Sequence, residues 1–378
     1  MKKTRGQNEG SIKKRADGRW EARVMREDGT RKSFYCKTRQ EAASRLTEAL
    51  GDIKKGLPIV DESQTVEEYL LSWVDAMKHT VKPRTWKYYK DYVRLHAIPL
   101  IGKVKLGKLK AQDIQSLYTR KLNQGLSSTT VNHLHAVLHK ALNNAFRLGL
   151  VQRNITDMVD HPRMAHHEIA PLTAEQVGAF LTAATGERLE ALYVLAVTTG
   201  MREGELLALT WRDIDFEKSR LQVRATLQFL EGKFVFTEPK TAGSRRNIGL
   251  PKITVEALRQ HRLRQNEERA LLEDNWDTSH DLIFPNTVGK PINATNLIKR
   301  GLKPLLKKAG VPPIRFHDLR HTAATLLLSK GVNVKVVSEM LGHADVTTTL
   351  RIYAHVLPHM QQTATDTMDV LFRDQLHE

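Results

Sequence analysis

At 378 residues, the chain exceeds the size at which one hydrophobic core keeps growing, so two or three domains are expected. It has no run of 18 apolar residues and a single cysteine, Cys36, which argues against a membrane span, an internal disulfide and a zinc site built on several thiolates. The charged N-terminus lacks the apolar segment of a signal peptide, and we expect a soluble protein of the cytoplasm.

The net charge of +17 is unevenly distributed along the chain. Residues 1–56 carry 16 Lys and Arg against 8 Asp and Glu, residues 57–167 carry 16 against 9, and residues 168–378 carry 27 against 25. The first 167 residues therefore supply most of the excess, as expected of regions that grip a polyanion. Nucleic acid is the leading partner, because no strongly amphipathic basic helix indicates an anionic membrane.

The first region alternates apolar and basic residues, with turn signals at Asp17-Gly18 and Asp28-Gly29, which predicts a small three-stranded antiparallel sheet. Residues 39–56 predict one helix closed by a glycine, which can cover one face of that sheet. The exposed face would present basic side chains to DNA, with solvated surface charge as the plain alternative. These side chains are Lys13, Arg19, Arg23, Arg31 and Lys32.

Residues 65–149 show apolar spacing close to 3.6 and no strand pattern, which predicts a module of four or five helices. Two helix starts in it offer backbone amides and side-chain donors of the kind that hold phosphates. The residues concerned are Lys82, Arg84, Thr85, Lys87 and Thr129. Each of them could equally be ordinary helix capping.

Residues 153–173 predict a linker, and its three histidines, His161, His166 and His167, lack a fixed geometry for metal ligation, so no metal site is expected. Beyond the linker the pattern predicts helices, then three strand-like runs between residues 220 and 250, then helices again. The expected class is α+β, with domains at residues 1–56, 63–158 and 168–378. The last domain would be mainly helical with a small antiparallel sheet.

Two basic residues of the last domain stand at positions suited to an anion. Arg202 follows a glycine at the first turn of a new helix, where backbone amides and the helix dipole favour negative charge. Lys240 is expected at the tip of a hairpin. The plain alternatives are that Arg202 pairs with Glu205 and that Lys240 is a solvated turn residue.

Two further stretches add histidines, an arginine and a tyrosine. In "HDLRHTAATLLLSKG", His317 and Arg320 share one helical face, and His321 follows His317 by four residues. In "LGHADVTTTLRIYAHV", His343 precedes Tyr353 by ten residues. His317 could instead be a satisfied core histidine, and Tyr353 could be a packing residue.

Together these residues are the inventory needed to attack a phosphodiester without a metal. Two guanidiniums can clamp the nonbridging oxygens and stabilise the added charge of the transition state. A phenol has an ordinary pKa near 10 and is a poor nucleophile until cations stabilise its oxyanion. No GxxxxGK[ST] motif occurs, so nothing in the sequence calls for ATP.

The stretches "TTGMREGELLALTW", "HDLRHTAATLLLSKG" and "LGHADVTTTLRIYAHV", in that order, resemble the catalytic boxes of the tyrosine recombinases. The layout from about Gly10 to about Pro358, with a basic N-terminal sheet and a helical core-binding (SAM-like) module, is similar to the integrases of temperate phages and integrative conjugative elements. The resemblance implies a site-specific DNA recombinase that integrates and excises a mobile element or prophage through a 3′-phosphotyrosyl intermediate, with no cofactor.

The resemblance also implies roles for the residues. Arg202 and Arg320 would bind the scissile phosphate, Lys240 would protonate the departing 5′ oxygen, and Tyr353 would attack phosphorus. Two histidines would assist by hydrogen bonding and proton transfer, and one acidic residue would orient neighbouring side chains; these are His317, His343 and Glu205.

The resemblance further implies double-stranded DNA with core and arm sites as the partner, a monomer when free and a tetramer on DNA, in association with the nucleoid. An excisionase and a host DNA-bending protein would be the accessory partners. The C-terminal tail carries Met368, Leu371 and Phe372 at helical spacing. This apolar face is expected to pack on a neighbouring protomer, with packing on its own domain as the alternative.

Three rival functions remain. A cellular Xer-like recombinase that resolves chromosome dimers shares the chemistry but lacks the basic sheet module of residues 1–56. A noncatalytic DNA-binding regulator would tolerate loss of Tyr353, whereas here all six active-site positions are filled. A type IB topoisomerase shares the nucleophile but needs no separate arm-binding module.

Overall fold

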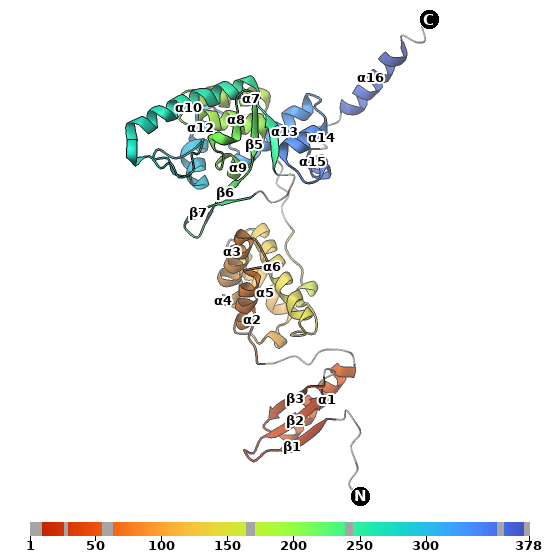
Figure 1. Ribbon diagram of the computed structural model, residues 1–378. Helices are drawn as coiled ribbons and strands as arrows, with labels where there is room; N and C mark the ends of the chain where they lie inside the picture. The colour runs from red at the N-terminus through yellow and green to blue at the C-terminus, as the bar shows by residue number, and fades with distance from the viewer. Residues whose placement is uncertain are drawn as a thin grey trace. The chain divides into compact units, whose positions relative to one another are not determined.

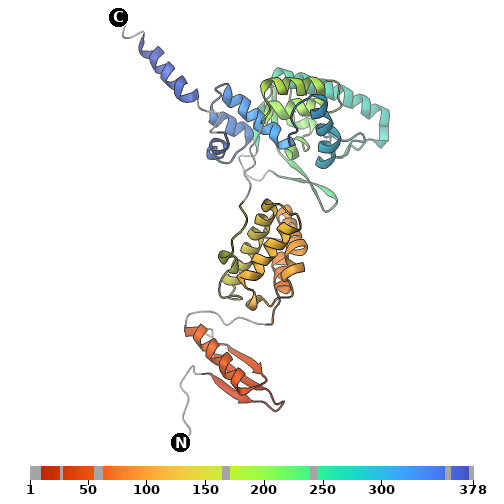
Figure 2. The same cartoon turned by 180° about the vertical axis from the view of Figure 1, so that it is seen from behind.

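The computed structural model describes residues 10–25, 29–54, 63–163, 171–238, 245–353 and 359–373. Contacts divide the chain into two compact units, residues 1–167 and 168–378. Figures 1 and 2 show the elements of both units in two views. Most elements are helices, and the strands form small antiparallel sheets, so the expected α+β class is confirmed. Within the described ranges, none of the helices combines the length and apolar character that a membrane span requires.

The first unit begins with the expected sheet and helix. Strands β1 (Ser11–Lys14), β2 (Trp20–Met25) and β3 (Arg31–Cys36) pair antiparallel in chain order, and α1 (Arg39–Lys54) follows them. The strand alternation places Ala22, Val24 and Cys36 on the face that α1 covers, where they are buried with residues of that helix. The sheet's other face, which carries the half-exposed Arg23 and Tyr35, is called the open face.

The register of this sheet corrects one expectation about its open face. Lys32 pairs with Val24, and directly paired residues point to the same side of a sheet. Val24 lies on the side that α1 covers, so Lys32 belongs to that side, whereas Arg31, paired with Met25, belongs to the open one. The expectation was wrong because it placed two consecutive residues on one face, which the two-residue period of a strand forbids.

The helical module follows in the same unit. Its helices are α2 (Val66–Met77), α3 (Pro83–Tyr92), α4 (Ile98–Ile101), α5 (Ala111–Asn123) and α6 (Ser128–Arg147). A π-helical turn, Val93–Ala97, joins α3 to α4 just before Pro99, a residue that has no N–H to donate to an α-helical ladder. Leu70, Leu117 and Leu134 are among the fully buried residues of the core.

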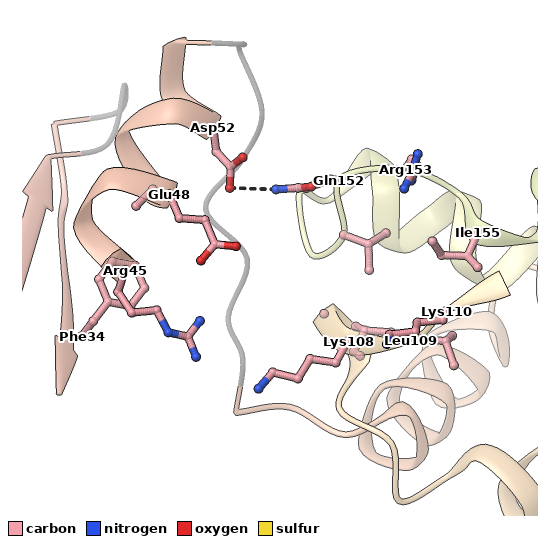
Figure 3. Close-up of a pocket in the computed structure, with 14 residues that line it drawn as sticks. Phe34, Arg45, Glu48, Asp52, Lys108, Leu109, Lys110, Gln152, Arg153 and Ile155 are labelled. Atoms are coloured by element: carbon pink, nitrogen blue, oxygen red, sulfur yellow. Dashed lines mark hydrogen bonds between the residues drawn. The ribbon is translucent and has the colours of Figure 1, made fainter. Parts of the chain in front are cut away.

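The beginning of the expected linker packs on this module. Asn154 caps a short 3₁₀ helix, Ile155–Met158, and His139 of α6 contacts Asp157 with a ring nitrogen 2.9 Å from the carboxylate. Residues of α1 and of the loops before α5 and after α6 line a pocket in which Gln152 Nε2 donates a hydrogen bond of 2.9 Å to Asp52 (Figure 3). None of the residues predicted to act on DNA lines this pocket.

The second unit is a helical body with two small sheets (Figure 1). Helix α8 contacts α7, α10 and α13, and its residues 191–193 and 195–197 are buried in the largest hydrophobic core among the described residues. The helices are α7 (Ala174–Ala184), α8 (Glu190–Thr199), α9 (Glu203–Leu206), α10 (Lys252–Leu272), α11 (Ala294–Asn296), α12 (Lys303–Lys308), α13 (Phe316–Ser329), α14 (Val334–Leu341), α15 (Val346–Tyr353) and α16 (His359–Arg373).

The strand region of the second unit differs from its expectation. Instead of three runs in one sheet, β4 (Ile214–Asp215), β5 (Arg220–Val223) and β8 (Arg246–Gly249) form one sheet, and β6 (Thr226–Leu230) and β7 (Lys233–Thr237) form a separate hairpin. The first expected run, which ends before the turn signal Glu231-Gly232, covers both β5 and β6, because apolar alternation continues across the change of sheet.

Lys240 follows β7 and lies outside the described residues. The two described strands that flank its segment do not pair with each other. β7 pairs with β6, and β8 pairs with β5. A turn signal between two strand-like runs predicts a reversal of the chain but cannot specify which strand comes to pair with which.

Candidate functional site

Arg202 stands between two helices of the second unit. Helix α8 ends at Gly200, whose φ of +61° is a left-handed conformation that glycine adopts without strain, and Arg202 is the N-cap of α9. Its backbone N–H and its Nη1 donate to the two carboxylate oxygens of Glu205, at 3.1 Å and 2.8 Å. The alternative that Arg202 pairs with Glu205 is therefore true, yet 39% of the arginine side chain remains exposed.

A second arginine, from strand β8, binds the same carboxylate. Arg246 begins β8, is 7% exposed, and donates from Nη2 to Glu205 at 2.9 Å and from Nε to the carbonyl oxygen of Met340 at 2.6 Å. A Cβ at Gly342 would come within 2.8 Å of its guanidinium. Arg246 thus joins the Arg202 segment to the segment that precedes His343.

The sequence reasoning did not single out Arg246, although one signal was available. Arg246 and Ile248 are two residues apart in a strand and so share a face, and Ile248 is buried. A charged residue on a buried strand face requires a buried partner of opposite charge. That partner is Glu205: burial alone raises the pKa of this carboxyl, but Arg246 and Arg202 outweigh the effect and hold the pKa below its ordinary value.

Arg320 is the most deeply buried cation of the site. It lies on α13 with 3% of its surface exposed, and its Nη1 donates to the carbonyl oxygen of Gly200 at 2.9 Å. Its Nη2 is buried and finds no hydrogen-bond partner within the described ranges. Burial and the nearby charge of Arg202 lower its pKa to about 9, so it remains a cation at neutral pH. A buried guanidinium N–H without a partner is costly unless a ligand accepts from it.

The two predicted histidines occupy different surroundings. His317 is exposed, so the alternative of a satisfied core histidine is wrong; its ring meets that of His321 edge-on at 5.0 Å. His343 is half-buried and its Nδ1 lies 2.7 Å from the hydroxyl of Thr349. Burial, followed by the charges of Arg320 and Arg202, lowers the pKa of His343 to about 4, and it is neutral at neutral pH.

Tyr353 is the last residue of α15 and is 2% exposed. Its ring packs with Leu328, Val337 and Leu341, and its hydroxyl lies 2.7 Å from Nδ1 of His321. Burial raises the pKa of Tyr353 to about 12, although the charge of Arg320 opposes the rise. The ring of Tyr353 is therefore a packing residue of the core, while its hydroxyl contacts an imidazole of the site. His321 is a site residue to which the sequence reasoning gave no role.

The structure thus gathers most of the predicted site residues from segments far apart in the chain. Charges that act on Arg320 include those of Arg202, Glu205, Arg246 and Tyr353, which places all of them within electrostatic reach. Three guanidiniums face one carboxylate, so the cluster keeps an excess of positive charge in a partly desolvated place. Such a cluster can bind a phosphate diester and stabilise further negative charge on it.

The open face of the N-terminal sheet carries the remaining predicted DNA contacts, now without Lys32. Arg23 is paired with Glu21 at 2.9 Å and Arg19 with Asp17 at 2.8 Å, and both arginines are about half exposed. The guanidinium of Arg19 also lies over the ring of Tyr35, 5.8 Å from its centroid. Tyr35 is 53% exposed and was missed by the sequence reasoning. Lys13 and Arg31 complete the face by register.

In the helical module, the predicted contacts stand at helix starts as expected. Lys82 is the N-cap of α3, Arg84 and Thr85 lie in its first turn, and Lys87 pairs with Asp91 at 2.6 Å. At the start of α6, the Ser127 hydroxyl accepts from the backbone N–H of Thr130 at 3.2 Å, which is ordinary capping. Thr129 beside it is exposed. The role of these residues toward DNA stays a prediction.

Comparison with known proteins follows the same division of the chain. Residues 171–360 match the family described as "Phage integrase family", and residues 65–122 match "Phage integrase, N-terminal SAM-like domain". A Caldanaerobacter subterraneus protein named "Tyrosine recombinase XerC-like" is 34% identical over 90% of this chain and 92% of its own. The "ICEBs1 integrase" of Bacillus subtilis is 28% identical over 77% of this chain and 78% of its own.

The fold is also similar to that of a solved structure. The Tn1549 transposon integrase, in complex with a circular intermediate DNA, superposes with a TM-score of 0.69 at 24% sequence identity. The match covers 81% of this chain and all of that one. At this level of identity the likeness establishes a shared fold.

Proposed function

The chain belongs to the phage integrase family, and we propose that it integrates and excises a mobile element by site-specific recombination of DNA. It is a tyrosine-type recombinase, which cuts and rejoins DNA strands. The observation that carries the proposal for its active site is a buried tyrosine hydroxyl within electrostatic reach of a buried arginine, whose Nη2 has no hydrogen-bond partner among the described residues. The hydroxyl is suited to act as a nucleophile, and the arginine is suited to bind an anion.

In the proposed reaction, Arg202 and Arg320 clamp the scissile phosphate while Tyr353 attacks phosphorus. The guanidiniums gain most as negative charge develops on the nonbridging oxygens, so they act on the transition state more than on binding. Arg246 supports this clamp because it donates to the carboxylate of Glu205, which in turn accepts from Arg202. The bond energy is kept in the tyrosyl link, so rejoining needs no ATP.

Replacement of the nucleophile tests the proposal. Tyr353→Phe removes only the hydroxyl, so binding to a core-site duplex should persist while the covalent protein–DNA adduct disappears. The adduct is measured on a nicked suicide substrate, whose short cut strand diffuses away and traps the intermediate. An adduct formed by the Tyr353→Phe protein would overturn the assignment of this tyrosine.

We propose that Lys240, which lies outside the described residues, donates the proton to the departing 5′ oxygen. Lys240→Ala should slow cleavage of ordinary DNA, and replacement of the bridging 5′ oxygen by sulfur should restore most of the rate, because sulfur leaves without a proton. Equal slowing on both substrates would assign Lys240 to another task.

The stoichiometry of the reaction supports assembly as a tetramer on DNA. Exchange between two duplexes cuts four strands, and each chain supplies one proposed nucleophile. Helix α16 presents Met368, Leu371 and Phe372 with about half of each side chain exposed, a face that a second protomer can cover. Truncation before α16 should leave core-site binding intact and weaken assembly of two sites into one complex. Normal assembly by the truncated chain would refute the tail's role between protomers.

The alternative of a Xer-like chromosome-dimer resolvase shares the chemistry and differs in its use of the N-terminal sheet. We propose that this sheet reads arm sites distant from the cut, a task for which its open basic face is suited. Deletion of residues 1–56 should abolish integrative recombination and spare cleavage of isolated core sites. Undiminished recombination by a folded truncation would favour the resolvase, which needs no arm sites.

A further inference from the structure

The contact between Tyr353 and His321 has no role in the reaction as described so far. The tyrosine hydroxyl lies 2.7 Å from Nδ1 of His321, and both residues are buried, with 2% and 7% of their surfaces exposed. Within the described ranges, His321 is the one group that hydrogen bonds to this hydroxyl. At this distance the two atoms share one hydrogen, so the direction of the bond determines what the histidine does.

The surroundings favour the imidazole as the acceptor. Burial lowers the pKa of His321, and Arg320 adds to the effect while Asp318 opposes it, so the ring is neutral at neutral pH. The raised pKa of Tyr353 keeps the proton on the phenol. A neutral imidazole with its proton on Nε2 offers the lone pair of Nδ1, toward which the phenol donates.

We propose that His321 takes the proton of Tyr353 when the tyrosine attacks the DNA phosphate. This inference rests on the proposed strand cleavage. The Oη–H bond breaks as the proton passes to Nδ1, the Oη–P bond forms, and the bond between phosphorus and the 5′ oxygen breaks with its electron pair on that oxygen. The 5′ oxygen takes its own proton from a separate donor, the role proposed for Lys240.

The same nitrogen serves the reverse step. When a 5′ hydroxyl attacks the phosphotyrosyl link, the bond between phosphorus and Oη breaks, and the charged imidazole returns its proton to the departing tyrosine oxygen. The neighbouring charge of Arg320 disfavours the protonated ring, which makes that return favourable. His321 is therefore a catalytic residue for both cleavage and rejoining.

His317 is the matched control, because it lies on the same helix one turn before His321. Its ring is 5.0 Å from that of His321, and it is exposed and makes no hydrogen bond to Tyr353 among the described residues. Substitution of either histidine by asparagine changes the chain by the same atoms. His321→Asn keeps a polar amide near the position of Nδ1, but an amide cannot take the proton.

The experiment measures single-turnover adduct formation on the nicked suicide substrate by the full chain. Both asparagine variants are made with tyrosine or with site-specifically incorporated 2,3-difluorotyrosine at position 353, whose lower pKa reduces the need for a base. We expect His321→Asn to slow the ordinary reaction by about 10²–10⁴-fold, the usual contribution of a general base. The fluorinated nucleophile should recover much of that loss in His321→Asn and none of the loss in His317→Asn. A bridging 5′ sulfur should not rescue His321→Asn.

Each outcome bears on one claim. No adduct from the unaltered chain would refute the proposed strand cleavage, whereas an adduct from it with an equal rate for His321→Asn would refute only the role of His321. If His321→Asn slows cleavage and the fluorinated tyrosine does not restore the rate, His321 is a positioning residue. If His321→Asn cleaves faster, His321 holds Tyr353 back from attack. Either result overturns the proposal. Should thermal melting show that His321→Asn is unfolded, His321→Gln carries the same comparison.

Discussion

The arginines of the N-terminal sheet and those of the second unit occupy opposite surroundings. Arg19 is 58% exposed and pairs with Asp17, which is 37% exposed, whereas Arg246 is 7% exposed and pairs with Glu205, which is 4% exposed. Exposed ion pairs contribute about 0–1 kcal/mol, so Arg19 can exchange its carboxylate for a phosphate at little cost. Separating the buried pair of Arg246 and Glu205 would cost much more free energy, so its geometry is fixed before DNA binds.

This difference separates affinity from rate. Mobile, exposed cations neutralise phosphates and release counterions, which sets how tightly and how salt-sensitively DNA binds. Buried and fixed cations meet the charge that develops during the reaction without reorganising, which sets how fast the strand is cut. Four predictions test that separation, two on the buried cluster, one on its histidines and one on the sheet.

Arg320→Ala should give the largest effect. Loss of one buried donor to the developing charge should lower the rate of adduct formation by about 10²–10³-fold, with little change in the affinity for core-site DNA. Single-turnover cleavage and a binding isotherm on the same duplex measure the two quantities. Arg19→Ala is the control from the N-terminal module and should leave core cleavage unchanged. If Arg320→Ala lost affinity and rate in equal proportion, the buried arginine would be a binding residue and the separation would fail.

Arg246→Met should mainly reduce stability. It leaves the Glu205 carboxylate buried beside a single half-exposed partner, and removal of one member of a buried pair costs about 3–5 kcal/mol. Urea unfolding followed by tryptophan fluorescence measures the loss. Because the cost comes from the stranded charge, Arg246→Met combined with Glu205→Gln should recover part of it. A double variant no more stable than the single one would show that packing, not charge, explains the burial of Arg246.

The same two residues illustrate how far the sequence could predict this protein. The helices and the first sheet follow from local periodicity, and so do Arg202 and Arg320 on their helices. Partners brought from distant segments do not: Arg246 lies 41 residues from Glu205, and His321 lies 32 residues from Tyr353. The sequence holds each of these residues but carries no local pattern that pairs them, because tertiary packing makes the pairs.

Acidification should destabilise the second unit. Burial lowers the pKa of His343 to about 4 and also lowers that of His321, so both folded-state values lie below the ordinary value of 6.5. Between pH 6.5 and 4 the unfolded chain binds more protons than the folded one, and stability present above pH 6.5 is lost as the pH falls toward 4. Urea midpoints at pH 7.5, 6 and 5 measure this, and His343→Asn should flatten the trend.

The N-terminal sheet provides the internal reference for that titration. Residues 1–56 contain no histidine, so the isolated module has no group of this kind to protonate over the same interval. A midpoint of the full chain that stayed constant from pH 7.5 to 5 would contradict the burial of neutral imidazoles in the second unit.

The smallest effect expected distinguishes two neighbours on β3. Arg31 and Lys32 carry the same charge and are adjacent in sequence, but the register turns Arg31 to the open face and Lys32 to the face that α1 covers. If the open face grips DNA, Arg31→Ala should weaken binding to arm-site DNA a few-fold and reduce the salt dependence of the binding constant by about one phosphate contact. Lys32→Ala should leave that salt dependence unchanged, because a side chain on the covered face does not reach the same phosphates. Titrations of labelled arm-site duplex at several salt concentrations measure both. If both variants lost affinity for arm-site DNA equally, the total charge of the module, and not the face on which each cation lies, would determine the affinity.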